Sequence, residues 1–177
     1  TLVNFKIRAR KLICVMQVKP RIKKLLHWYD SNHRKLPFRL TTDPYKIWIS
    51  EVMLQQTQIN TVIPYYNNWV KKYPTLAHVS RAKLSELLKS WEGLGYYTRC
   101  TNLHKTSKII LDQYNGFIPQ NYKKFIELPG VGEYTAAAVL SIAFNQKIPA
   151  IDGNVKRIMS RYLGIKNITP RNYKRIK

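Results

Sequence analysis

The sequence predicts an all-α protein, and three observations support this prediction. Apolar residues recur at helical spacing from residue 20 onward, and the first such set is Ile22, Leu25, Leu26 and Tyr29. Residues that start or stop helices separate the apolar stretches, as Asp43-Pro44 and Gly93-Leu94-Gly95 do. Alternating apolar and polar runs, which would indicate strands, are not evident.

The boundary residues predict each helix in turn. Residues 21–31 form the first. Asp43 is a suitable N-cap with Pro44 at N1, so a helix should begin there and end near Gln56. The next should cover residues 59–72, with Pro64 as a break or a restart.

In the second half, Ser80 should cap a segment that runs to Trp91, and the glycines at 93 and 95 then force a turn. Further helices are expected over the following ranges: 98–114 with Gly116 as its stop, 121–127, 133–144, and a last one from Asp152 or Gly153 to Gly164. Trp48, Trp69 and Trp91 are expected in the core.

Composition limits the class of protein. The chain has 177 residues, of which 45% are hydrophobic, which is enough for a packed core and excludes general disorder. No apolar run is long enough to span a bilayer. Two cysteines, Cys14 and Cys100, are too few for a disulfide scaffold or a cysteine-rich metal site within these residues, and a reducing compartment is expected.

Charge indicates the kind of partner. Lys and Arg number 31 against 9 Asp and Glu, so the formal net charge is +22. Such a charge attracts polyanions, of which nucleic acid is the first candidate and an anionic membrane surface the second. Biased base composition in the coding DNA is an alternative source of part of the lysine content. Residues 1–19 are basic and free of acid, and we expect a dispensable extension there rather than a phosphate-contacting arm.

The strongest local motif is a glycine-rich turn between two predicted helices. It consists of Leu128, Pro129, Gly130, Val131 and Gly132. The glycines permit a tight reversal, which leaves backbone N–H groups at the start of the next helix. Those amides and the helix dipole suit a phosphate oxygen, so the turn predicts a helix-hairpin-helix that holds a DNA backbone. An ordinary interhelical turn is the alternative.

Two carboxylates are candidates for chemistry. Glu51 lies among bulky apolar residues, where desolvation favours a neutral carboxyl that can donate a proton. Asp152 follows an extended apolar stretch and precedes a basic helix. Cleavage of a glycosidic bond requires two such groups, one to protonate the leaving group and one to stabilise the positive sugar. Taken alone, a solvated carboxylate at Glu51 and a helix N-cap at Asp152 are the favoured interpretations.

Four blocks in order resemble the helix-hairpin-helix DNA glycosylases, and within them the adenine DNA glycosylase (MutY) type. They are residues 50–58 (SEVMLQQTQ), 93–97 (GLGYY), 128–132 (LPGVG) and 151–155 (IDGNV). The resemblance covers roughly Leu25 to Gly164. It implies a six-helix barrel over residues 36–146, residues 20–35 as the N-terminal helix of a second lobe, and residues 147–177 as the start of its C-terminal part.

The resemblance also implies a reaction and the residues that perform it. These enzymes remove adenine mispaired with 8-oxoguanine after the base has left the duplex. Glu51 would protonate the adenine, Asp152 would stabilise the sugar, and Tyr134 would help to order the sugar and Asp152. Related endonuclease III enzymes carry a lysine at the position of Tyr134, and tyrosine cannot form a Schiff base, so base removal without strand cleavage is expected.

Contacts to DNA and to the base are implied in the same way. Gln56 would be a minor-groove wedge, with Gln55 and Thr57 beside it, and Leu94 and Tyr96 would lie next to the oxidised guanine. Phe38, Arg39 and Leu54 would form the substrate pocket, although the family usually has tryptophan where this chain has Phe38.

The resemblance also implies a cofactor and partners, but the cysteines of this chain differ from the family pattern. Family members bind a 4Fe-4S cluster through four cysteines, and neither Cys14 nor Cys100 fits that spacing, so no cofactor and no metal are expected on residues 1–177. The expected partner is double-stranded DNA that contains a mispair, bound by a monomer with no membrane role. A cytoplasmic location with the nucleoid is expected, with organellar import as the alternative. A non-catalytic DNA-binding remnant and a glycosylase for another base remain alternative functions.

Overall fold

The computed structural model describes residues 20–176. Over that range it contains ten α-helices, one short 3-10 helix and no strand, so the predicted all-α class is confirmed. The expected N-terminal extension, residues 1–19, and Cys14 lie outside the described residues.

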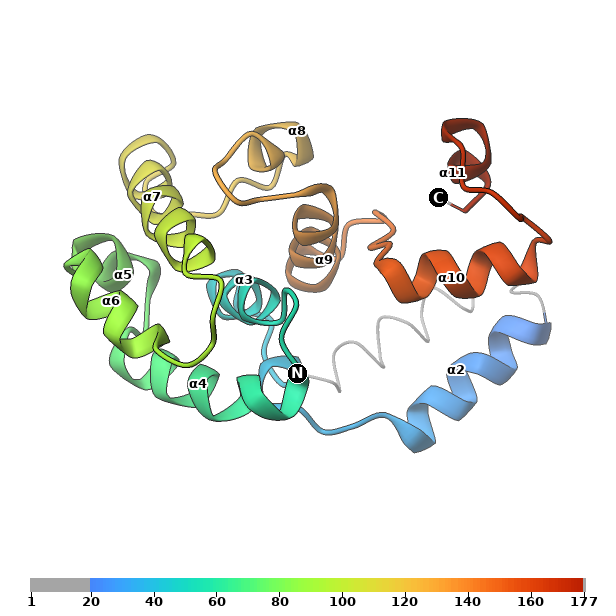
Figure 1. Ribbon diagram of the computed structural model, residues 1–177, viewed down its shortest axis with the longest axis horizontal. Helices are drawn as coiled ribbons and strands as arrows, with labels where there is room; N and C mark the ends of the chain where they lie inside the picture. The colour runs from blue at the N-terminus through green and yellow to red at the C-terminus, as the bar shows by residue number, and fades with distance from the viewer. Residues whose placement is uncertain (1–19, 177) are drawn as a thin grey trace.

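The helices form two groups in space (Figure 1). Helices α3 to α9, here called the barrel helices, lie together, and α2, α10 and α11, here called the flanking helices, lie to one side of them. In chain order the elements are α2 (Pro20–Asn32), η1 (Pro37–Arg39), α3 (Pro44–Met53), α4 (Ile59–Lys72), α5 (Leu76–Arg81), α6 (Leu84–Trp91), α7 (Thr98–Gln113), α8 (Tyr122–Ile126), α9 (Glu133–Phe144), α10 (Gly153–Tyr162) and α11 (Pro170–Ile176).

Helix α3 is the central element of the barrel helices. Eight of its ten residues are buried, and it contacts α4, α7 and α9. A helix with so few exposed residues is stable only when other elements surround it. Asp43 begins it as predicted, since its carboxylate accepts hydrogen bonds from the backbone N–H groups of Tyr45 (2.9 Å) and Lys46 (3.4 Å). Glu51 is thereby carried into the interior.

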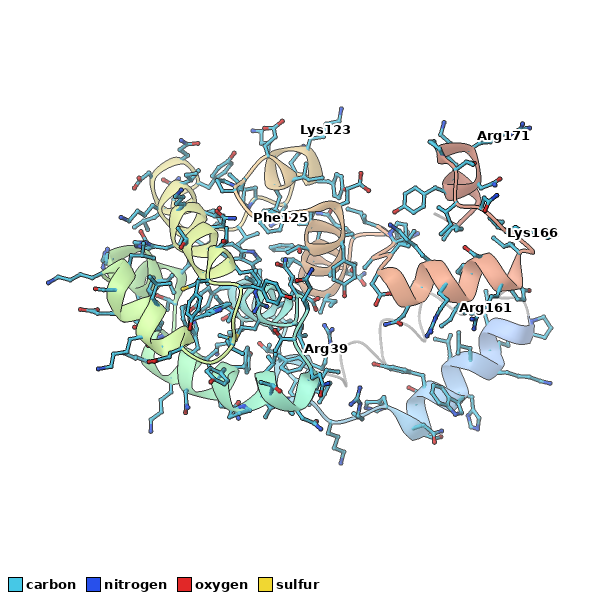
Figure 2. The ribbon with its side chains drawn as sticks, in the orientation of Figure 1. Arg39, Lys123, Phe125, Arg161, Lys166 and Arg171 are labelled. Carbon is cyan, nitrogen blue, oxygen red and sulfur yellow. The ribbon has the colours of Figure 1, made fainter. Side chains whose placement is uncertain are left out.

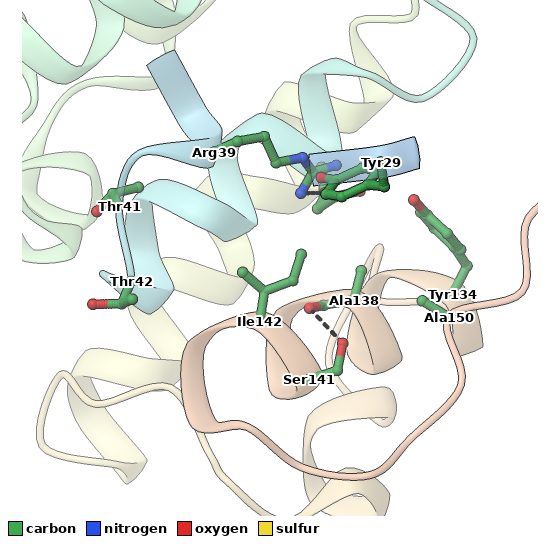
Figure 3. A pocket seen from close by; sticks show the side chains of 10 residues that line it. Tyr29, Arg39, Thr41, Thr42, Tyr134, Ala138, Ser141, Ile142 and Ala150 are labelled. Carbon is green, nitrogen blue, oxygen red and sulfur yellow. Dashed lines mark hydrogen bonds and ion pairs between the residues drawn. The ribbon is translucent and has the colours of Figure 1, made fainter. Parts of the chain in front are cut away.

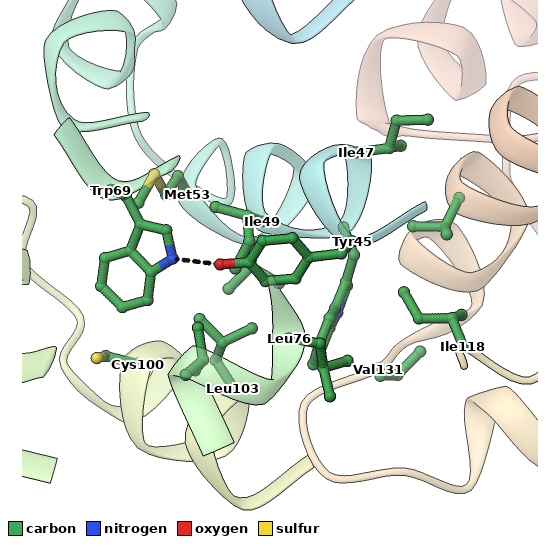
Figure 4. Packing of buried hydrophobic residues seen from close by; sticks show 14 of the residues in the cluster. Tyr45, Ile47, Ile49, Met53, Trp69, Leu76, Cys100, Leu103, Ile118 and Val131 are labelled. Atoms are coloured by element: carbon green, nitrogen blue, oxygen red, sulfur yellow. Dashed lines mark hydrogen bonds between the residues drawn. The ribbon is translucent and has the colours of Figure 1, made fainter. Parts of the chain in front are cut away.

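Aromatic residues fill the core of the barrel helices. Trp48, Trp69 and Trp91 are almost completely buried, which confirms their predicted place. The indole N–H of Trp69 donates to the Tyr45 hydroxyl (3.2 Å; Figure 4). The Tyr45 hydroxyl in turn donates to the carbonyl of Tyr73 (2.6 Å). The polar atoms of Trp69 and Tyr45 therefore have hydrogen-bond partners inside the core.

The flanking helices bury much less. The cluster of buried apolar residues in this part consists of Ile151 and Ile165, on either side of α10, and Ile176 of α11. Large apolar side chains on α2 and α10 remain exposed, among them Trp28 (59% exposed) and Ile158 (59%).

The structure corrects two predictions about helices α4 to α6. Helix α4 is continuous through Pro64, whose side chain is exposed, so the backbone position that loses its hydrogen bond faces outward. Ser80 does not cap a helix but lies buried within α5, and extended backbone at Ala82 separates α5 from α6. Because α5 is separate from α6, residues 36–146 hold seven α-helices, one more than the helix boundaries read from the sequence.

Two further differences concern helix ends. Helix α3 ends at Met53 rather than near Gln56, because Gln56 adopts the left-handed conformation with φ 56°. Helix α11 was not predicted. Its signal is the pair Thr169-Pro170, since the Thr169 hydroxyl accepts from the N–H of Asn172 (3.2 Å) and thus caps the helix.

Candidate active site

A cavity of about 330 Å³ opens where α2, α3 and α9 meet the segment that follows α9. This volume is at the lower end of the range of about 300 to 1,000 Å³ that small-molecule sites occupy. Its lining residues, drawn in Figure 3, are Tyr29, Arg39, Thr41, Thr42, Glu51, Tyr134, Ala138, Ser141, Ile142 and Ala150. Three predicted site residues, Glu51, Tyr134 and Arg39, therefore share one cavity.

Glu51 is buried and paired with a positive charge. The residue is 2% exposed, and its Oε1 lies 2.9 Å from Nη1 of Arg39. The two atoms form an ion pair without the alignment of a hydrogen bond. The Arg39 side chain is 31% exposed and lies against the ring of Phe38. The burial predicted for Glu51 is present. The ion pair with the Arg39 guanidinium is an additional feature that the sequence does not predict.

Tyr134 connects the charges around the cavity. Burial raises the pKa of its hydroxyl, the charge of Glu51 and a hydrogen bond with Glu51 raise it further, and Asp152 adds to the effect, while Arg39 opposes it. The phenol is therefore neutral near pH 7 and remains a hydrogen-bond donor. Its hydroxyl points toward the Arg39 end of the cavity (Figure 3). Both candidate carboxylates lie within electrostatic reach of this one side chain.

Asp152 is the N-cap of α10. Its Oδ1 accepts from the backbone N–H of Val155 (2.7 Å), and Asn154 Nδ2 donates to its Oδ2 (3.3 Å). The side chain is half-buried and lies two residues beyond Ala150, which lines the cavity. The cap that the sequence indicated is present, and it holds the carboxylate at the start of a helix.

The other predicted pocket residues lie in the core. Phe38 is fully buried and packs edge-on against Tyr66, with ring centroids 5.5 Å apart. Leu54 is half-buried at the C-terminal end of α3 and packs against the core. Arg39 is the member of this predicted set that lines the cavity.

Four polar lining residues were not identified from the sequence: Tyr29, Thr41, Thr42 and Ser141. For Tyr29, the sequence shows only its helical spacing on α2. No local sequence signal distinguishes them, since each reaches the cavity through the packing of separate segments.

The glycine-rich turn lies between α8 and α9 as predicted. Gly130 has φ 76°, and a Cβ added there would lie 2.8 Å from Cβ of Asn102, so both the backbone conformation and the close approach require glycine. The Thr106 hydroxyl donates to the carbonyl of Pro129 (2.7 Å) and secures the turn from α7. Lys123 extends outward from α8 (Figure 2).

The remaining predicted DNA contacts fall on two turns. Gln56, after α3, and Tyr96, before α7, are exposed and both have positive φ, 56° and 49°. Leu94 differs from this pair, because it is 5% exposed and belongs to the core. Gln55 is half-buried, and its Nε2 donates to the Thr135 hydroxyl (3.3 Å), next to Tyr134.

The residues present do not fit a cluster held by four cysteines. The sequence has two cysteines, and Cys100 is fully buried in the barrel core, where burial raises its thiol pKa to about 12. Among residues 20–176, no group of three or more His, Cys, Asp or Glu side chains is placed to hold a metal ion.

Within residues 20–176, no helix is both long and apolar enough to cross a membrane.

Comparison with protein families gives one match across most of the chain. Residues 49–176 match the family described as the HhH-GPD superfamily of base excision DNA repair proteins. The chain is 48% identical over 142 residues to an adenine DNA glycosylase of Buchnera aphidicola, subspecies Baizongia pistaciae, and 43% identical over 150 residues to that of Homo sapiens. Each alignment covers 80% of this chain, but 40% of the Buchnera protein and 28% of the human one.

Solved structures show the same fold. A thermostable thymine-DNA glycosylase matches with a TM-score of 0.79 and 32% identity. A trapped covalent intermediate of endonuclease III with DNA, described as an estranged-adenine complex, matches with a TM-score of 0.70 and 28% identity. Each match covers 84% of this chain and 70% of the other.

Proposed function

Because the chain belongs to the HhH-GPD superfamily of base excision DNA repair proteins, we propose that it acts as an adenine DNA glycosylase. The proposed reaction hydrolyses the N-glycosidic bond of adenine mispaired with 8-oxoguanine or guanine. The observation that carries the proposal is Glu51, a carboxylic acid 2% exposed at the wall of a cavity of about 330 Å³. A buried acid in such a cavity is suited to protonate a leaving base.

The ion pair with Arg39 gives the first step. A base entering the cavity meets the half-exposed guanidinium before it meets the buried carboxyl. When the guanidinium moves from Glu51 to the entering base, the carboxylate of Glu51 takes up a proton from solvent and faces the base. Glu51 then donates its proton to a ring nitrogen of adenine, and the bond to the sugar breaks.

Asp152 and Tyr134 act on the sugar. The Asp152 carboxylate stabilises the oxocarbenium-like centre, or captures it briefly, before water adds. Tyr134, a neutral donor, orients Glu51 and the sugar. With tyrosine at this position and no amine nucleophile there, the product is an abasic site rather than a cut strand.

DNA is held by charge and by the α8–α9 turn. The first-turn amides of α9 and the helix dipole bind a phosphate, and the net charge of +22 supplies non-specific affinity. Gln56 and Tyr96, exposed on neighbouring turns, enter the minor groove beside the extruded base.

The test is base excision in a duplex with one adenine opposite 8-oxoguanine, followed by alkali to reveal abasic sites. DNA incubated with the wild-type chain should contain cut strands after alkali treatment. Without alkali treatment, the same DNA should contain no cut strands. Glu51→Gln should reduce the rate by roughly 10²- to 10⁴-fold, because an amide cannot donate this proton. Glu86→Gln, an exposed carboxylate on α6, is the matched control and should leave the rate unchanged.

Two results would contradict the proposal. Wild-type protein that binds DNA in a salt-sensitive manner but never releases adenine is a binding remnant. Equal rates for wild type and Glu51→Gln would remove Glu51 from the reaction. A second candidate, excision of a different base, is favoured by the structural match to a thymine-DNA glycosylase, and parallel assays with thymine opposite guanine separate it.

A further inference from the structure

Arg99 joins two surface turns that are far apart in the sequence. Its guanidinium donates to backbone carbonyls at the end of α3, those of Val52 (3.0 Å), Met53 (2.8 Å) and Gln55. It also donates to the carbonyls of Leu94 and Gly95, both at 3.1 Å. One side chain on α7, 9% exposed, thus holds the turn at residues 54–57 and the turn at residues 93–96.

The chemistry of these contacts requires arginine. The last carbonyls of a helix have no partner within it, so the end of α3 presents acceptors that a buried donor must satisfy. Guanidinium carries five N–H groups in a planar fork and reaches acceptors on both sides, whereas an ammonium carries three on a single atom. A further contact to the Thr57 hydroxyl (3.1 Å) extends the network to the far end of the first turn.

Both turns are held in a backbone conformation that non-glycine residues seldom adopt. Gln56 and Tyr96 have φ values of 56° and 49°, and such residues persist where the surroundings fix them. The Tyr96 ring packs over the Arg99 guanidinium at 5.5 Å, and the Trp91 ring does the same at 5.5 Å. An open hollow of about 450 Å³ separates the exposed tips and is lined by Gln55, Gln56, Tyr96, Thr98 and Arg99.

We propose that Arg99 is a positioning residue that fixes the 54–57 turn and the 93–96 turn to each other, so that Gln56 and Tyr96 engage DNA as one rigid unit. The benefit to mispair recognition rests on the proposed function, but the mechanical link does not. Loss of Arg99 should therefore loosen both turns together and leave the α8–α9 turn, which binds phosphate, as it was.

Amide hydrogen exchange of the 177-residue chain tests the link without DNA. In Arg99→Lys, exchange should accelerate at least 10-fold in residues 54–57 and 93–96 together, with no change in residues 128–132. Arg81→Lys, an exposed arginine at the end of α5, is the matched control and should change neither turn. Acceleration in one turn only, or equal acceleration throughout the chain, would overturn the proposal.

Binding to two duplexes tests the consequence. Wild type should prefer a duplex with adenine opposite 8-oxoguanine over a matched duplex, and Arg99→Lys should lose at least 10-fold of that preference while matched-duplex affinity stays constant. Retention of the preference by Arg99→Lys would overturn this part. A wild-type protein without any preference would instead refute the proposed function, and hydrogen exchange would still decide the link.

Thr57→Val serves if Arg99→Lys fails to fold. It removes a side-chain acceptor from the network and leaves the backbone acceptors and Arg99 in place. Exchange should accelerate in both turns, by less than in Arg99→Lys. Acceleration confined to the 54–57 turn would show that the two turns are independent.

Discussion

The barrel helices and the flanking helices contribute unequally to the structure and to the candidate site. The barrel helices surround a core of tryptophan, phenylalanine and aliphatic side chains, whereas the flanking helices expose large apolar residues and have beside them a cluster of three buried isoleucines, on and around α10 and α11. Glu51 belongs to the first group and Asp152 to the second. The proposed acid is therefore fixed by a large core, while the proposed sugar-stabilising carboxylate depends on a small one.

The largest test of this difference compares two tryptophans. Trp91→Ala, which removes a fully buried side chain from the barrel core, should lower the free energy of unfolding by about 3–5 kcal/mol. Trp28→Ala, at a position 59% exposed on α2, should change it by less than about 0.5 kcal/mol. Urea unfolding measures both. Similar losses would mean that the flanking helices are packed as firmly as the barrel.

The next largest expected effect is a difference in stability between alanine substitutions at two glycines with positive φ. Gly130→Ala should cost about 2–3 kcal/mol, because it adds a clash with Asn102 to the left-handed backbone. Gly164→Ala, at the end of α10, should cost about 1 kcal/mol, since an added Cβ there meets no atom within 4 Å. Thermal unfolding compares the pair, and a larger loss for Gly164→Ala would reverse the comparison.

Two aspartate N-caps give a smaller difference. Asp43→Ala should lower the free energy of unfolding by about 1 kcal/mol, because α3 folds with the whole barrel core. Asp152→Ala should mainly accelerate hydrogen exchange in the first turn of α10, with a smaller global effect. Asn replacements at both positions are the controls, since Asn caps as well as Asp. A global loss at Asp152 equal to that at Asp43 would contradict this prediction.

The smallest expected effect is a loss of stability at acidic pH. Burial lowers the pKa of His104 on α7, and Lys108 lowers it further. The unfolded chain then binds the proton more readily than the native protein, so stability should fall as the pH drops below the unfolded value of about 6.5. Urea midpoints at pH 7 and pH 5 should differ less in His104→Gln than in wild type. His33→Gln, one residue beyond the end of α2, is the control and should leave the difference unchanged.

Local sequence signals predicted most of the fold, and tertiary packing accounts for what they missed. Asp43-Pro44 located the start of α3 because an N-cap acts within one turn of helix. The predicted break at Pro64 is wrong, because a proline on the exposed side of a helix can be accommodated without interrupting it. Thr169-Pro170 carries the same cap signal as Asp43-Pro44, and α11 was overlooked rather than unpredictable.

The sequence identifies individual residues of the candidate site, but it does not predict how they contact one another. Glu51, Arg39 and Tyr134 were each singled out, and the structure brings them to one cavity. The pairing of Arg39 with Glu51 joins η1 to α3, and no periodicity or cap indicates it. Arg99 was missed for the same reason, because its acceptors come from two turns about 40 residues apart along the chain.

The order in which the cavity wall is assembled has a consequence for synthesis. Tyr29 comes from the first described helix, Glu51 from the next α-helix, Tyr134 from the last barrel helix, and Ala150 from the segment after it. A chain emerging from the ribosome therefore presents Glu51 before α9 can pack against α3 and complete the wall of the cavity. Nascent protein arrested before residue 134 would have the acid but no enclosure around it, and would be inert toward a nucleobase.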